Sequence, residues 1–293
     1  MLEITTNRKQ HVVFFVKVEL HCICTDRSKY KKIRTGVLTM AWITLRYFSE
    51  VLGMQRELYA IVPQKNKAGE IGLSDNGTDL RGKCLYLLHG LSDDHTIWMR
   101  RTSIERYAEA YGLTVVMPNG DVSFYTDMKH GRKYYTHIAQ EIPRIAQEFL
   151  HVSGRREDSF IAGLSMGGYG ALKIGLRESH AFRACAALSP VTDLHFLSAY
   201  DDLYDAILGA NCPIPAQDDL FALASQHQND AQKPDIYLTI GTEDALYPSA
   251  VRFRDVMRKL PYQFEWRDGH GSHSWDYWDA EIQNVMAWMA ALS

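Results

Sequence analysis

Cysteine is scarce in this chain: five cysteines are spread irregularly over 293 residues. An odd, sparse set of cysteines argues against a disulfide framework and fits a reducing compartment. Cys22 and Cys24 form one closely spaced pair, but no second pair of cysteines follows to complete a zinc site. The cysteine content therefore supports neither a disulfide scaffold nor a zinc module.

An excess of charge is also missing. The 32 lysines and arginines are nearly balanced by 35 aspartates and glutamates, which gives a net charge of −3. This balance gives no sign of nucleic acid or of another strongly charged partner. A homo-oligomer is compatible with an aromatic-rich, weakly charged chain, but no sequence feature specifies one.

The sequence lacks long hydrophobic runs near its beginning. The longest apolar stretch there is VVFFV at 12–16, which is too short to span a membrane. No small-residue cleavage site follows it, so we expect no secretory signal and a cytoplasmic location.

The first 39 residues differ from the rest of the chain. They are rich in lysine and arginine, contain no glycine before Gly36 and carry no recognisable motif. A strand pattern then begins at Met40, so we predict an N-terminal arm at 1–39 and a single domain at 40–293. The alternative is that VVFFVKVEL, at 12–20, adds a further strand to that domain.

From about Lys83 onward, short apolar runs alternate with helical segments. Continuous apolar runs are typical of strands buried on both faces of a parallel sheet. Their alternation with helices predicts right-handed crossovers and helices on both faces. The runs are KCLYLLHG, LTVVMPNG, DSFIAGLS, FRACAALSP and DIYLTIG, and they are preceded by two alternating strand patterns, WITLRYF and RELYAIVP.

Two segments between the predicted strands are informative. The segment 137–152 has helical spacing, which predicts one buried face formed by Ile138, Ile142, Ile145 and Phe149. The long segment 191–234 interrupts the alternation and predicts short helices and loops. Insertions at the C-terminal edge of such a sheet usually shape the ligand site, so we expect this one to cover the active site.

The stretch FIAGLSMGGYG places a serine between an apolar run and a glycine-rich helix start. Residues 163–167 match the G-x-S-x-G pattern of a nucleophile elbow, with the strand and helix that this turn requires on either side. Gly163 and Gly167 leave room for a very sharp turn, because neither has a Cβ. The pattern predicts Ser165 as a nucleophile; an incidental serine in a glycine-rich turn is the alternative.

A serine nucleophile needs a base and a group that orients the base. In folds that carry such a serine elbow after a strand of a parallel sheet, the three groups follow one another along the chain in the order serine, acid, histidine. The sequence GTED follows a late apolar run and favours Asp244 as the acid, with Glu243 as its rival. The later loop RDGHGSH contains His270 and His273, and either histidine could reach Ser165.

The two histidines and Asp268 could instead bind a metal ion. Loop spacing of this kind is nonspecific, so this interpretation is not favoured. We expect neither a metal nor any other cofactor.

An oxyanion intermediate needs two backbone N–H donors. The residue after the nucleophile, Met166, supplies one in elbows of this type. The H-G turn after LYLL predicts Leu91 as the second donor, with His89 as a residue that orients the loop.

The motifs LLHGLSDDHTIW, GLSMGGYGALK, GTED and GSHSWDYW together resemble the esterase D family of α/β hydrolases, and within it the small bacterial tributyrin esterases. The resemblance runs from about Met40 to the C-terminus. It implies an α/β-hydrolase fold, no cofactor and a Ser–His–Asp triad that hydrolyses short-chain esters of small molecules. The family's catalytic histidine precedes a short polar residue and a tryptophan, which favours His273 over His270.

The resemblance leaves the substrate open. The same family includes S-formylglutathione hydrolases, feruloyl and acetylxylan esterases and mycolyltransferases, so the triad cannot identify the substrate. An acyltransferase and a noncatalytic binding module are the alternatives of other classes. Trp98 and Tyr125 lie near the motifs and are predicted to contact the substrate, with core packing as the alternative for each.

Overall fold

The computed structural model describes residues 39–64 and 79–292, which all belong to one compact unit, Gly36–Ser293. The predicted arm lies outside the described residues except for Thr39, which begins the first strand. The alternative strand at 12–20 lies outside them as well. None of the described helices is long and apolar enough to cross a membrane.

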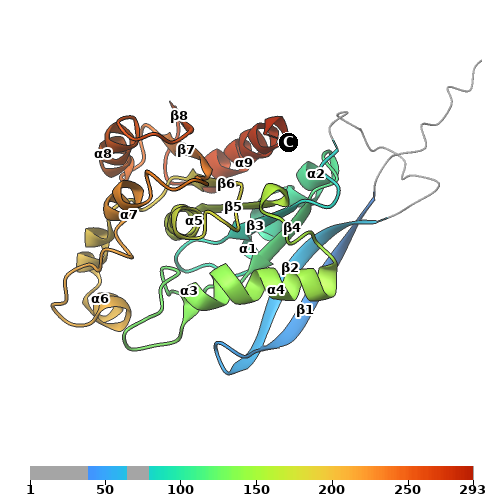
Figure 1. The fold of residues 1–293 in the computed structure, drawn as a ribbon, viewed down its shortest axis with the longest axis horizontal. Coiled ribbons are helices and arrows are strands. Elements are labelled where there is room, and N and C mark those ends of the chain that lie inside the picture. The colour runs from blue at the N-terminus through green and yellow to red at the C-terminus, as the bar shows by residue number, and fades with distance from the viewer. Residues whose placement is uncertain (1–38, 65–78, 293) are drawn as a thin grey trace, which may run out of the picture. The chain divides into compact units, whose positions relative to one another are not determined.

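The strands of the described residues form one sheet in the order β1-β2-β4-β3-β5-β6-β7-β8 (Figure 1). β1 pairs antiparallel with β2, β2 pairs antiparallel with β4, and the remaining pairs are parallel. The predicted parallel sheet is therefore confirmed. The strands are β1 (Thr39–Ser49), β2 (Met54–Gln64), β3 (Cys84–Leu88), β4 (Thr114–Pro118), β5 (Ser159–Leu164), β6 (Ala184–Leu188), β7 (Asp235–Gly241) and β8 (Phe264–Gly269).

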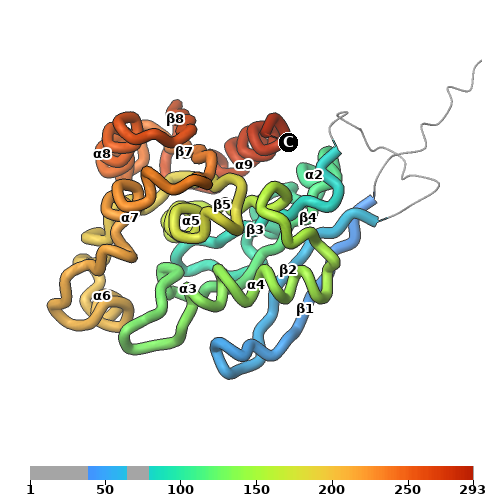
Figure 2. The backbone as a smooth tube through the Cα atoms, viewed as in Figure 1, coloured from blue at the N-terminus to red at the C-terminus, as the bar shows by residue number. Residues whose placement is uncertain are grey.

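Helices cover both faces of the sheet, and a cluster of buried apolar side chains lies on each face. One cluster includes α4, α5, α7 and α8, and the other includes α1, α2 and α9; Figure 2 shows α4 and α9 on opposite sides. The helices are α1 (Ile97–Arg101), α2 (Ile104–Glu109), α3 (Tyr134–Thr136), the π-helix η1 (His137–Glu141), α4 (Ile142–Leu150), η2 (Arg156–Asp158), α5 (Met166–Arg177), η3 (Leu194–Ala199), α6 (Asp201–Leu208), α7 (Leu220–Gln226), α8 (Tyr247–Met257) and α9 (Trp275–Ala291).

The helix predicted at 137–152 is less regular than its pattern indicated. It begins as η1, a π-helical turn, and continues as α4 to Leu150. Phe149 was expected on the buried face but is 53% exposed, and Leu150 is buried instead. A π turn takes in an extra residue, so one helical period does not extend through the whole segment.

The segment 191–234 folds into η3, α6, α7 and their loops, as predicted. A buried ion pair joins it to α5: Lys173 Nζ lies 2.5 Å from Asp218 Oδ1 and donates to the carbonyl of Tyr125 at 3.0 Å. The Tyr169 hydroxyl of α5 donates to the carbonyl of Asp218 at 2.7 Å. Burial lowers the pKa of Lys173 to about 8, although Asp218 favours its charged form.

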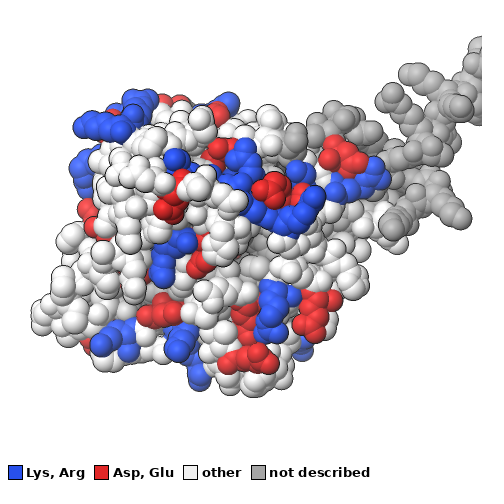
Figure 3. Space-filling view, viewed as in Figure 1, with Lys and Arg blue, Asp and Glu red and all other residues white. Residues whose placement is uncertain are grey.

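Charged side chains are interspersed on the surface. Figure 3 shows lysine and arginine beside aspartate and glutamate on the visible face, without a large patch of one sign. This distribution agrees with the balanced composition and gives no docking surface for a polyanion on that face.

We predict that Asp218→Asn destabilises the fold by about 3–5 kcal/mol, because it leaves the Lys173 ammonium buried without its counter-charge. Urea unfolding measures the change. Asp219→Asn is the matched control: Asp219 caps α7 by accepting the N–H of Phe221, and asparagine caps equally well. Equal stability of the two variants would contradict the prediction.

Candidate active site

Ser165 lies at the sharp turn between β5 and α5. Its backbone angles are φ 53° and ψ −116°, a strained conformation for a residue with a Cβ, and its N–H donates to the carbonyl of Leu188 at 2.9 Å. A Cβ on Gly167 would lie 2.6 Å from the carbonyl oxygens of Leu88 and His89, and one on Gly163 would collide with the backbone of Gly167. The two glycines therefore give the turn the room that the sequence pattern predicted.

A continuous hydrogen-bonded chain of three side chains begins at this serine. Ser165 Oγ lies 3.0 Å from His273 Nε2, and His273 Nδ1 lies 2.7 Å from Asp244 Oδ2. With the Nδ1 proton directed to the carboxylate, Nε2 is free to accept the serine proton. The structure thus brings together the three residues that the sequence analysis favoured, although they lie in three turns or loops that are far apart in the chain.

Asp244 is held as a carboxylate. It is 4% exposed and also accepts the N–H of Leu246 at 2.9 Å. Burial raises the pKa of this group, but the hydrogen bonds from His273 and Leu246 outweigh burial and leave the pKa below its ordinary value. Asp244 is therefore ionised at neutral pH.

The rival residues pair with each other. His270 Nδ1 lies 2.6 Å from Glu243 Oε1, and the two side chains are 91% and 53% exposed. Asp268 accepts a hydrogen bond from Tyr247 instead of joining the histidines, and the described residues contain no group of three side chains that could hold a metal ion.

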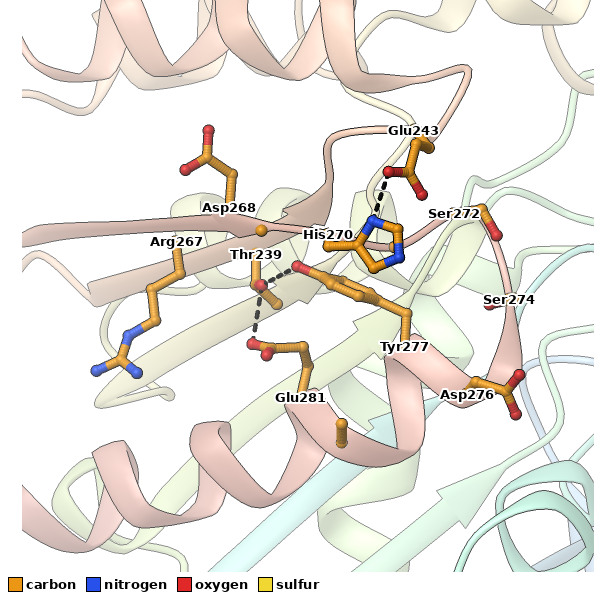
Figure 4. Close-up of a pocket in the computed structure, with 13 residues that line it drawn as sticks. Thr239, Glu243, Arg267, Asp268, His270, Ser272, Ser274, Asp276, Tyr277 and Glu281 are labelled. Carbon is orange, nitrogen blue, oxygen red and sulfur yellow. Dashed lines mark hydrogen bonds and ion pairs between the residues drawn. The ribbon is translucent and has the colours of Figure 1, made fainter.

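A cavity of about 590 Å³ lies between the end of β8, the loop that carries His273 and the start of α9 (Figure 4). Its floor is a polar network in which Tyr277 and Glu281 both contact the hydroxyl of Thr239, at 2.6 and 2.9 Å. Ser165, His273 and Asp244 are not among its lining residues. The cavity therefore borders the loops that carry Asp244 and His273 without being lined by those two residues or by Ser165.

The predicted oxyanion donors, Met166 and Leu91, belong to segments that adjoin Ser165. Met166 is the first residue of α5, so its N–H belongs to the helix end that has no intrahelical acceptor. Leu91 follows Gly90, where a Cβ would lie 3.7 Å from the Cβ of Ser165. The loop after β3 therefore passes directly beside Ser165.

His89 fixes that loop. Its Nε2 accepts the N–H of Gly120 at 2.9 Å, while its Nδ1 lies 2.8 Å from the carbonyl of Gly90. Burial lowers the pKa of His89, so the ring is neutral and can serve as both donor and acceptor.

The family model described as "Putative esterase" matches residues 78–289. The chain belongs to this esterase family. The solved structure of fluorophosphonate-binding serine hydrolase F of Staphylococcus aureus is similar, with 34% identity, a TM-score of 0.77, and coverage of 86% of this chain and 99% of that chain. The S-formylglutathione hydrolase of the same organism shows 35% identity, a TM-score of 0.75 and the same coverage.

An acetyl esterase of Caldicellulosiruptor saccharolyticus is 28% identical over 267 residues, which are 87% of this chain and the whole of that protein. Together these similarities confirm the predicted α/β-hydrolase fold and make the protein a carboxylic ester hydrolase.

Trp98 and Tyr125 of the esterase, which were predicted to contact the substrate with core packing as the alternative, are both buried, and burial favours the packing alternative. Trp98 is 1% exposed and donates its indole N–H to the carbonyl of Leu88 at 3.0 Å. Tyr125 is fully buried and donates its hydroxyl to the carbonyl of His89 at 2.9 Å. Both side chains donate their hydrogen bonds to backbone carbonyls at the end of β3. They are therefore packed in the core and hold the end of this strand in place.

Sequence reasoning missed an aromatic contact with the histidine itself. The Trp278 ring lies edge-to-face with His273, with 4.8 Å between centroids, and packs in the same way on Trp275, which contacts Trp98. The spacing of Trp275 and Trp278 on one helix face was the available signal.

We predict that Ser165→Gly is more stable than Ser165→Ala by about 1 kcal/mol or more, because glycine adopts this backbone conformation without strain. Both variants lose the hydroxyl, so the comparison separates strain from chemistry. Urea unfolding of the two proteins checks this, and a less stable glycine variant would show that the turn is not strained.

Proposed function

We propose that this esterase hydrolyses short-chain carboxylic esters in the manner of the tributyrin esterases of the esterase D family. Ser165 acts as the nucleophile, His273 as the general base and Asp244 as the group that orients the histidine. The observation that supports this is the unbroken chain from Ser165 Oγ to His273 Nε2 at 3.0 Å and from His273 Nδ1 to Asp244 at 2.7 Å.

Acylation follows from that chain. His273 Nε2 removes the proton of Ser165 as Oγ forms a bond to the ester carbonyl carbon, and Asp244 stabilises the imidazolium. The negative charge on the carbonyl oxygen is stabilised by the N–H groups of Leu91 and Met166. His273 then gives its proton to the leaving alcohol as the bond from carbon to the leaving oxygen breaks.

Deacylation repeats the sequence with water. His273 takes a proton from water as the water oxygen attacks the acyl carbon, and it returns a proton to Ser165 when the acid leaves. Every proton in these two steps moves between Ser165, His273, water and the leaving group, so the steps need no cofactor.

The preference for a short acyl group rests on the acetyl esterase relative, which matches over its whole length. Thioester hydrolysis is the second candidate, favoured by the 35% identity to an S-formylglutathione hydrolase. It uses the same acylation step with a thiolate as the leaving group. Feruloyl-type hydrolysis has the weaker support of a ferulic acid esterase structure at 22% identity, which shows the fold alone.

We predict that the wild-type enzyme hydrolyses p-nitrophenyl acetate and butyrate faster than the octanoate or methyl ferulate, and that Ser165→Ala abolishes turnover. A panel of initial rates with these esters and S-formylglutathione checks both statements. A preference for ferulate would reject the substrate class while leaving the role of the serine intact; residual turnover by Ser165→Ala would reject that role.

We predict that Asp244→Asn lowers kcat about 10⁴-fold, because the amide no longer holds the required histidine tautomer. Glu243→Gln is the matched control on the adjacent residue, and His270→Gln removes its partner; both are expected to stay within about threefold of wild type, because exposed pairs contribute little. Steady-state rates with p-nitrophenyl acetate measure the difference. A larger loss for Glu243→Gln than for Asp244→Asn would reverse the assignment.

A further inference from the structure

The imidazole of His273 is restrained more firmly in some directions than in others. Hydrogen bonds tie Nδ1 to Asp244 at 2.7 Å and Nε2 to Ser165 at 3.0 Å. Ring nitrogens donate and accept in the plane of the imidazole, so these two bonds resist sliding within that plane more than tilting out of it. The side chain is also 36% exposed, so solvent gives no support on one side. The remaining restraint has to come from side chains that pack against the ring.

Trp278 provides such packing. Its ring and that of His273 are 89° apart in orientation, with 4.8 Å between centroids, which is a contact distance for an edge-to-face pair. Trp278 lies near the start of α9 and is only 6% exposed, so its ring cannot turn away into solvent. The contact therefore closes space into which the imidazole would otherwise move.

The Trp278 ring is itself fixed by a series of ring contacts. It packs edge-to-face on Trp275 with 5.2 Å between centroids, and Trp275 packs in the same way on Trp98 at 5.3 Å. Trp98 is anchored by its indole N–H to the carbonyl of Leu88 at the end of β3. The indole N–H of Trp278 has no hydrogen-bond partner among the described residues, so ring contacts hold this side chain in place.

The proposed reaction removes one of the two hydrogen bonds of His273. In the free enzyme the Ser165 hydroxyl donates to Nε2. In the acyl-enzyme Ser165 Oγ is bonded to the acyl carbon and carries no proton, and the neutral imidazole keeps its own proton on Nδ1, toward Asp244. Neither Oγ nor Nε2 then has a proton to donate to the other. His273 is left with Asp244 and Trp278 at the step in which it takes a proton from water.

Resting on the proposed function, we propose that Trp278 is a positioning residue that keeps His273 aligned as the base during deacylation. Acylation depends on it less, because the Ser165 hydroxyl then orients the imidazole directly. Loss of the Trp278 ring therefore slows the attack of water more than it slows formation of the acyl-enzyme. A role in packing alone predicts no such difference between the two steps.

Kinetics with p-nitrophenyl acetate test the two steps separately. The ratio kcat/KM reports acylation, and the decay of the acetyl-enzyme, followed by quenched flow and intact-mass spectrometry, reports deacylation. For Trp278→Leu we expect deacylation to slow about tenfold and acylation to slow less than about threefold. The acetyl-enzyme then accumulates, and kcat and KM fall together.

Two further variants serve as controls. Trp278→Phe keeps an aromatic ring and should recover part of the deacylation rate. Trp288→Leu is the matched change on the same helix, at a ring that packs on Tyr237 with 5.3 Å between centroids, and both steps should stay within about twofold of wild type. Titration with a fluorophosphonate counts the reactive enzyme in each sample, so a partly unfolded variant does not imitate slow chemistry.

The proposal is overturned if Trp278→Leu slows both steps by the same factor, slows acylation more, or changes neither. It is also overturned if Trp288→Leu shows the same selective loss. If Trp278→Leu does not fold, the same comparison is made with Trp278→Phe. A wild-type enzyme that forms no acetyl-enzyme and does not hydrolyse p-nitrophenyl acetate would instead reject the proposed esterase function.

Discussion

The backbone strain at Ser165 is the constraint on which the rest of the site depends. A residue with a Cβ keeps the backbone angles φ 53° and ψ −116° only where the surrounding structure excludes conformations of lower energy. Here α5 and the end of β3 press against the turn so closely that neither Gly163 nor Gly167 could carry a Cβ. The end of β3 is held against the turn by hydrogen bonds of three side chains, those of Trp98, Tyr125 and His89.

Asp244 and His273 are positioned by a second close approach of the backbone. The loops after β7 and β8 are joined by hydrogen bonds from Thr242 N–H to the carbonyl of Gly269 at 2.8 Å and from Glu243 N–H to that of Gly271 at 3.0 Å. Gly241 has no room for a Cβ against Gly271. Backbone contacts therefore fix the separation of Asp244 and His273, and the exposed pair formed by Glu243 and His270 lies on the outside of the same junction.

The sequence was sufficient where local chemistry and chain order act together. The elbow around Ser165, the alternation of strands and helices, and the preference for Asp244 over Glu243 followed from short patterns, whereas the choice of His273 over His270 needed the family resemblance. The burial of Trp98 and Tyr125 could not be predicted, because nearness to a motif does not determine burial. The hydrogen bond from Arg56 to the carbonyl of Asn119 could not be predicted, since the two residues come together only through strand register.

The hydrogen bond between Ser165 and His273 spans 108 residues of sequence. The turn at Ser165 is formed by β5 and α5, whereas His273 lies between β8 and α9. Contacts of such long range form late, because the intervening loop must first lose its conformational freedom. If Ser165 and His273 act as proposed, esterase activity requires β8 and α9 to be folded against the rest of the sheet, so activity would report on the fold as a whole.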